Sequence, residues 1–106
     1  MNNKTQSMLR LAKKAGKITL GYDIAIENIK NKLSSLILYT YDLSDRTLKK
    51  LNQETEKYKI DIIKVDISMD EIYEILGKTS GVVSINDIGF AKKIRELLIE
   101  NSLGGK

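Results

Sequence analysis

The chain has 106 residues, of which 42% are hydrophobic and 30% are charged, as expected for one globular domain over residues 1–106. It contains no cysteine and no histidine, which excludes disulfides, thiolate chemistry and Ser-His-Asp or Cys-His catalysis. The net charge of +4 suits an anionic partner such as a phosphate backbone, although a lysine-rich solvated surface explains it equally well.

Helix and strand patterns alternate along the chain, starting with a helix that ends at Gly16 and a short strand over residues 18–20. A second glycine, Gly21, opens the next helix, and residues 36–41 are apolar in the manner of a central strand covered on both faces. The apolar positions at helical spacing are Met8, Leu11, Ala12 and Ala15 in the first helix, and Tyr22, Ile26, Ile29 and Leu33 in the second. We expect both stripes to be buried.

Two further strands, over residues 60–65 and 82–85, and three further helices complete the pattern. Side chains that can accept hydrogen bonds from free amides mark the helix starts. These caps are Asp42 and Ser44 for the third helix, Ser68 with Glu71 for the fourth, and Asn86 or Asp87 for the fifth. Residues 103–106 are predicted to be a frayed tail.

The alternating order of helices and strands predicts an α/β fold. Strands separated by helices require crossover connections, which place helices on both faces of one sheet. We therefore predict a three-layer α/β/α sandwich with about four strands. Tyr39, Tyr41, Tyr58 and Tyr73 fall in the predicted stripes or strands, and we assign them to the core rather than to base stacking.

The first candidate binding segment is the opening of the second helix. Ligands of such sandwiches favour the place where strands end and helices begin. Gly21 permits a tight turn, and the free amides of the helix start can hold a phosphate or a base edge, with Tyr22 beside them. A turn glycine followed by Asp23, an acid that complements the helix dipole, is the alternative interpretation.

The second candidate segment is the small polar loop that follows Gly77 and contains Lys78, Thr79, Ser80, Gly81 and Val82. Its amides, hydroxyls and lysine can contact a nucleic-acid backbone, although a helix cap followed by a plain connection explains it as well. A nucleotide-binding P-loop is excluded, because Ile72 stands where the upstream glycine belongs and the loop precedes a strand. Asp42 and Asp45 are better explained by helix capping than by a metal or catalytic site.

Two stretches, "LAKKAGKITLGYDIAIENIKNKLSSLILYTYDLSDRTLKKL" and "ILGKTSGVVSINDIGFAKKI", resemble the YlxQ-like ribosomal protein family. This is a bacterial branch of the kink-turn-binding superfamily that includes the large-subunit ribosomal proteins 7Ae and 30e. The resemblance covers about residues 8–99 and implies a three-layer sandwich with a mixed sheet that binds RNA without catalysis. In the superfamily, the helix opening enters the widened major groove of a kinked stem, and a second loop packs against a flipped-out nucleotide.

Carried over by position, the resemblance implies a first contact at Lys17, Gly21, Tyr22, Asp23, Ile24 and Glu27, and a second from Lys78 to Val83. The archaeal pattern has Asn and Glu, then Lys one turn later, where this chain has Asp23, Ile24 and Glu27. Each lost polar contact would cost about 1–3 kcal/mol, by analogy with base readout in DNA. The residues therefore predict a weaker or different RNA target.

We predict a non-enzymatic, ribosome-associated RNA-binding protein, monomeric and cytoplasmic, whose partner is a structured, kink-turn-like RNA. No cofactor, metal, membrane or small-molecule substrate is expected. The predicted RNA-binding residues are Lys13, Lys14, Lys17, Gly21, Tyr22, Asp23, Ile24, Glu27, Lys30, Lys78, Thr79, Ser80, Gly81 and Val82. The alternative is a protein-interaction module of the same fold that has lost kink-turn binding. A more distant alternative is an enzyme, which would need a concave pocket with converging titratable groups.

Overall fold

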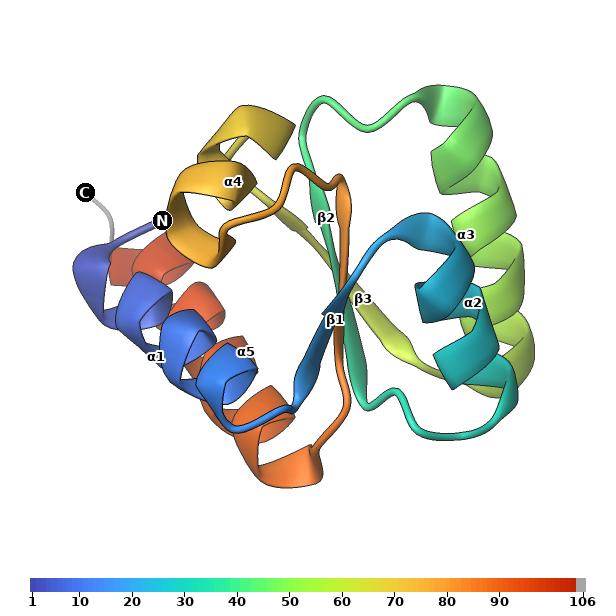
Figure 1. Ribbon diagram of the computed structural model, residues 1–106, viewed down its shortest axis with the longest axis horizontal. Helices are drawn as coiled ribbons and strands as arrows, with labels where there is room; N and C mark the ends of the chain where they lie inside the picture. The colour runs from blue at the N-terminus through green and yellow to red at the C-terminus, as the bar shows by residue number, and fades with distance from the viewer. Residues whose placement is uncertain (105–106) are drawn as a thin grey trace.

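The computed structural model describes the backbone of residues 1–104 and the side chains of residues 1–100 (Figure 1). The elements in chain order are α1 (Asn3–Lys14), β1 (Ile18–Leu20), α2 (Tyr22–Lys30), β2 (Leu36–Thr40), α3 (Asp45–Tyr58), β3 (Asp61–Val65), α4 (Met69–Leu76), β4 (Val82–Ile85) and α5 (Ile88–Gly104). The predicted alternation of helices and strands is confirmed. The predicted tail, 103–106, overlaps the end of α5, and 105–106 lie outside the described residues.

The four strands form one mixed sheet in the order β1-β4-β2-β3. β4 is antiparallel to both of its neighbours, whereas β2 and β3 are parallel. As a result, β1, β2 and β3 all end where β4 begins. We call this the carboxyl end of the sheet, marked by Leu20, Thr40, Val65 and Val82. The opposite, amino end is marked by Ile18, Leu36, Asp61 and Ile85.

Helices cover both faces of this sheet, as predicted. α1, α4 and α5 lie on one face, and α2 and α3 lie on the other (Figure 1). Alternate residues of β2 point to the two cores: Leu36 and Leu38 pack beneath α1, α4 and α5, and Ile37 packs with α2 and α3. The fold is therefore a three-layer α/β/α sandwich, and its central strand is buried on both faces.

Side-chain caps fix most of the helix starts that bear on the site. Ser68 accepts a hydrogen bond from the Glu71 amide at 3.2 Å, and the Ser68 amide donates to Glu71 Oε1 at 2.9 Å. This capping box begins α4 as predicted. Ser44 caps α3, but the assignment of Asp42 to that helix is wrong. Its carboxylate instead accepts from the Met69 amide, at 3.2 Å, in the first turn of α4.

Five side chains predicted to be buried are exposed, among them Ala15, which directly follows α1. In α1 the buried residues are Thr5, Leu9 and Ala12, so the core face is centred on Leu9. Leu11, two residues further, is turned about 200° away from it and is 53% exposed. α2 ends at Lys30, and Lys32 then takes a left-handed conformation (φ 61°), so Leu33 lies outside the helix. Leu33 is 57% exposed.

Two tyrosines assigned to the core are also on the surface. Tyr41 comes one residue after the end of β2 and is 55% exposed. Tyr73 is 57% exposed because α4 buries Ile72, Ile75 and Leu76 instead. Both assignments failed because an apolar pattern shows the spacing of a stripe but not where its edge falls.

Lys59 allows a stability test, because it ends α3 with a left-handed backbone (φ 57°). A residue with an L side chain destabilises the folded state by roughly 1–2 kcal/mol when its backbone is left-handed, and glycine avoids this cost. Glycine also makes the unfolded chain more flexible, which offsets part of the gain. Lys59→Gly should therefore raise the free energy of unfolding by about 1 kcal/mol, measured by urea denaturation. Lys57→Gly, inside the last turn, should lower it by a similar amount. A loss of stability in both variants would contradict this interpretation of the α3 terminus.

Candidate nucleic-acid interface

The start of α2 lies against the loop between α4 and β4, at the carboxyl end of the sheet. The Gly21 amide donates to the Val82 carbonyl oxygen at 3.0 Å, which continues the β1–β4 pairing one step beyond Leu20. From the loop, Lys78 Nζ donates to the carbonyl oxygen of Leu20 at 3.4 Å, across 58 positions of sequence. The two segments predicted from the sequence therefore form one surface.

Gly21 shapes this surface through its backbone conformation. Its φ of 126° is one that L side chains rarely adopt, whereas an added Cβ would meet nothing closer than Ile24 Cγ2 at 3.7 Å. No side chain caps α2, and the Gly21 carbonyl accepts from the Ala25 amide at 3.2 Å. Within the described residues, the amides of 22–24 consequently have no acceptor and point out of the helix start, where the partial charge is positive.

The outer face of α2 is acidic and partly apolar. Asp23, Ile24 and Glu27 are exposed, so each of these predicted residues is accessible. Tyr22 is different, because its ring packs against the α2–α3 core and is only partly exposed. Burial is the main cause that raises the pKa of Tyr22 above its ordinary value of 10.0. The negative charges of Glu54 and Asp23 raise it further. The Tyr22 hydroxyl therefore remains a neutral hydrogen-bond donor, and its ring is not a free stacking platform.

The loop after α4 divides into an accessible half and a buried half. Lys78 and Thr79 are exposed. Ser80 is buried, and its hydroxyl lies 3.1 Å from the Val82 amide and 2.8 Å from the Val82 carbonyl oxygen. Gly81 and Val82 are buried as well. Ser80, Gly81 and Val82 therefore shape the loop, and Lys78 and Thr79 offer their side chains to a ligand.

The other predicted lysines do not join this surface. Lys13 and Lys14 end α1, and Lys17 directly precedes β1 at the amino end of the sheet. The Lys17 carbonyl accepts from the amide of Asn86, the residue that follows β4, at 2.8 Å. Lys30 ends α2, about 12 Å along the helix axis from Tyr22. The lysines among the predicted RNA-binding residues are thus split between the two ends of the sheet.

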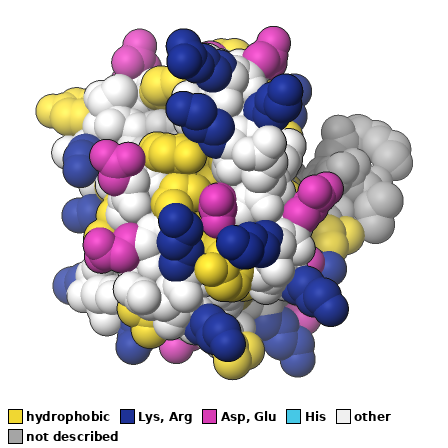
Figure 2. All heavy atoms as spheres, turned by 90° about the vertical axis from the view of Figure 1, so that its right-hand side faces the viewer, with side chains coloured by type: hydrophobic (Ala, Val, Ile, Leu, Met, Phe, Trp, Pro, Cys, Tyr) yellow, Lys and Arg dark blue, Asp and Glu magenta, His cyan; other side chains and the backbone are white. Residues whose placement is uncertain are grey.

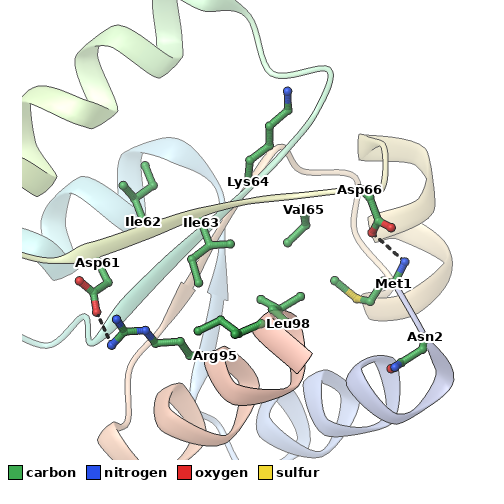
Figure 3. Close-up of a pocket in the computed structure, with 11 residues that line it drawn as sticks. Met1, Asn2, Asp61, Ile62, Ile63, Lys64, Val65, Asp66, Arg95 and Leu98 are labelled. Carbon is green, nitrogen blue, oxygen red and sulfur yellow. Dashed lines mark hydrogen bonds and ion pairs between the residues drawn. The ribbon is translucent and has the colours of Figure 1, made fainter. Parts of the chain in front are cut away.

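A groove lies elsewhere, along the free side of β3 (Figure 3). It has a volume of about 880 Å³, with Ile63, Val65 and Leu98 among its lining residues. Four of its charged groups form two pairs: Arg95 Nη1 lies 2.8 Å from Asp61 Oδ2, and the amino terminus lies 2.7 Å from Asp66 Oδ1. None of the predicted RNA-binding residues lines it, and no sequence motif indicated it.

Among the described residues, no group of three or more acidic side chains is placed to hold a metal ion. None of the helices in this part of the chain combines the length and the apolar character that crossing a membrane would require.

Comparison with known proteins gives consistent results. Residues 3–95 match the ribosomal protein L7Ae/L30e/S12e/Gadd45 family. The chain is 33% identical over 95 residues to the RNA-binding protein YlxQ of Enterococcus faecium, covering 90% of this chain and 91% of that protein. It is 36% identical over 96 residues to the RNA-binding protein YlxQ of Bacillus subtilis (strain 168), covering 86% and 91% respectively.

Solved structures share the fold. A protein of unknown function from Bacillus halodurans superposes with a TM-score of 0.86 at 26% identity, over 93% of this chain and 100% of the other. The Giardia lamblia 15.5kD RNA binding protein superposes with a TM-score of 0.75 at 13% identity, over 93% and 91%. The second likeness shows the fold alone.

Gly81→Ala tests the packing that holds the loop. A Cβ at Gly81 would lie 2.8 Å from Leu43 Cδ1 and 3.1 Å from Met69 Cε. Because both atoms end flexible side chains that can shift, we expect this crowding to lower the free energy of unfolding by about 1 kcal/mol, measured by urea denaturation. Thr79→Ala, in the exposed half of the loop, should stay within about 0.5 kcal/mol of the wild type. Equal stability of the two variants would show that the loop yields without cost.

Tyr22→Phe tests the burial of the hydroxyl. Folding raises the pKa of the Tyr22 hydroxyl. As the pH rises above 10.0, the hydroxyl therefore loses its proton in the unfolded chain before it does so in the folded protein. The contribution of the neutral Tyr22 hydroxyl to the free energy of unfolding is complete below pH 10.0 and is lost as the pH rises through the folded-state pKa. Wild-type stability should therefore fall more steeply above pH 10.0 than that of Tyr22→Phe, followed by denaturant titration. Parallel pH profiles would contradict this account.

Proposed function

Because this chain belongs to the ribosomal protein L7Ae/L30e/S12e/Gadd45 family and is similar to YlxQ RNA-binding proteins, we propose that it is a non-enzymatic, ribosome-associated protein of the cytoplasm that binds kink-turn-like RNA. The observation that carries the proposal is the juxtaposition at the carboxyl end of the sheet. The uncapped start of α2 and the exposed Lys78 and Thr79 lie on one surface, joined by the Gly21–Val82 hydrogen bond.

The chemistry of this surface suits a phosphate backbone and base edges together. The outward amides of residues 22–24 donate hydrogen bonds, and the Lys78 ammonium pairs with a phosphate. The carboxylates of Asp23 and Glu27 accept hydrogen bonds from the amino groups of bases. A regular RNA duplex hides its major-groove edges in a deep, narrow groove, so the proposed target is a stem that a kink has opened.

The exposed face of α2 favours a second candidate function, a protein-interaction module. Ile24 is 36% exposed and lies between two acidic side chains, Asp23 and Glu27, on that face. Such a combination suits a protein surface better than an RNA groove. This candidate predicts that neither a kinked stem nor a duplex binds through the start of α2.

Lys78→Gln tests the proposed surface. The variant should bind a kink-turn stem about tenfold more weakly, because about 1.4 kcal/mol is lost with one phosphate contact. The slope of log K against log salt should become less negative by about one unit. Fluorescence anisotropy with a labelled kink-turn stem and a plain duplex of equal length measures both quantities.

Lys93→Gln supplies the matched control, since Lys93 is exposed on α5, on the opposite face of the sheet from α2. It should behave as the wild type. If the wild type does not prefer the kink-turn stem to the duplex, or if the two variants are equally weakened, the proposal fails and the interaction module becomes the better account.

A further inference from the structure

Five exposed lysines gather at the amino end of the sheet, opposite the surface described above. We call them the basic end: Lys13, Lys14, Lys17, Lys30 and Lys32. We infer that the basic end is a second RNA contact, one that holds the phosphate backbone of duplex RNA and allows one protein molecule to bridge two RNA segments. The bridging rests on the proposed function, which puts the first RNA at the start of α2. The contact between the basic end and an RNA phosphate backbone does not depend on that proposal.

The basic end draws its lysines from both outer layers of the sandwich. α1 and α2 cover opposite faces of the sheet, and both end here, in the lower part of Figure 1. Between them, Lys17 is joined to Asn86 by the 2.8 Å backbone hydrogen bond, and the Ser35 amide donates to the Ile85 carbonyl at 2.8 Å. The lysines therefore extend across the end of the sheet. Figure 2, which views the α2–α3 side, shows Lys and Arg side chains along the lower edge of the molecule.

These ammonium groups are not needed to complete the fold. Carbonyls in the last turns of both helices are already bonded: Ala12 accepts from the Lys17 amide at 2.9 Å, and Asn28 accepts from the Leu33 amide at 2.8 Å. Neither ion pair of the described residues involves the basic end. Asp87, which lies beside it after β4, already accepts from the Phe90 amide at 2.8 Å. The lysine charges are therefore available to an outside anion.

A polar network beneath the lysines makes this surface rigid. Asn28 Nδ2 and Asn86 Nδ2 both donate to Thr19 Oγ1, at 2.9 and 3.2 Å. Ser84 Oγ lies 2.6 Å from Asn86 Oδ1 and 2.9 Å from Ser34 Oγ. The network ties the segment after α2 to β1 and β4, so the backbone near Lys17, Lys30 and Lys32 is held in place. A surface organised in advance loses less entropy when it binds.

The composition of the basic end specifies the chemistry of its ligand. Lysine is a point charge suited to phosphate, and the five side chains that define the surface include no amide or guanidinium that reads base edges. Binding should therefore be independent of sequence and strongly dependent on salt. The five residues of β2 separate the two ends of the sheet by about 13 Å. An RNA on the basic end and one at the start of α2 thus contact different parts of the molecule.

The test compares Lys13→Gln, Lys17→Gln and Lys30→Gln combined in one variant with the wild type. A labelled plain RNA duplex is titrated with the full chain at several salt concentrations and followed by fluorescence anisotropy. The wild type should bind with a steep salt slope. The triple variant should bind at least about tenfold more weakly at low salt, with a slope less negative by about two to three units.

A charge-matched control combines Lys49→Gln, Lys50→Gln and Lys64→Gln, all exposed and outside the basic end. Bridging is measured with a kink-turn stem on a surface, saturated with protein, over which the labelled duplex is passed. The wild type and the control should capture the duplex, and the triple variant should not. Equal weakening by the two triple variants, wild-type affinity of the basic-end variant, or binding to anionic lipid vesicles without binding to duplex RNA would overturn the inference.

The arms separate the two proposals. Failure of the wild type to prefer the kink-turn stem to the duplex overturns the proposed function. The loss of duplex binding in the basic-end variant would still stand as evidence for the second contact. Conversely, if the wild type prefers the kink-turn stem while the basic-end variant binds the duplex as the wild type does, only the second contact is overturned.

Discussion

The antiparallel pairing of β1 with β4 is the constraint on which the candidate interface depends. β1 has only three residues, and the Gly21–Val82 hydrogen bond carries its pairing one step into the turn. That bond occupies the Gly21 amide and leaves the next three amides facing outward at the start of α2. Because the φ of 126° at Gly21 is reached readily only by glycine, a single residue determines both the turn and the accessibility of those amides.

The helices and strands were predictable because local chemistry marks their ends. The Ser68–Glu71 capping box and Gly77, with its left-handed φ of 82°, delimit α4 in both the sequence and the structure. α2 carries no comparable signal at its end. Lys32 takes the left-handed conformation there, and nothing in its residue type announces it. The prediction therefore extended the helix to Leu33, and an exposed side chain was assigned to the core.

The candidate site could be predicted only in part. Each of its two segments is marked by its own residues, but their arrangement in space depends on how the strands pair. Gly21 and the loop from Lys78 stood out by composition, and the structure places them side by side. Lys17 is four residues from Gly21, and proximity in sequence suggested a common site. β1 intervenes and carries the two residues to opposite ends of the sheet. The groove beside β3 was not predictable either, since only the strand order shows that β3 has a free side.

The two ends of the sheet carry different distributions of charge. The start of α2 offers Lys78 and amide dipoles but also carries Asp23 and Glu27, with Glu54 close enough to act on Tyr22. The basic end is about 13 Å away along the sheet, which exceeds the Debye length of about 10 Å at 0.1 M salt. Of the two acids of α2, Glu27 lies three residues from Lys30, which can offset its charge, whereas Asp23 lies about 10 Å from Lys30 along the helix axis and is not neutralised by the basic end. Under the two proposals, the carboxyl end of the sheet would select its ligand by hydrogen bonds at short range, and the amino end would attract polyanions by charge. A net charge of +4 thus combines two ends with different surface chemistry, which composition alone could not separate.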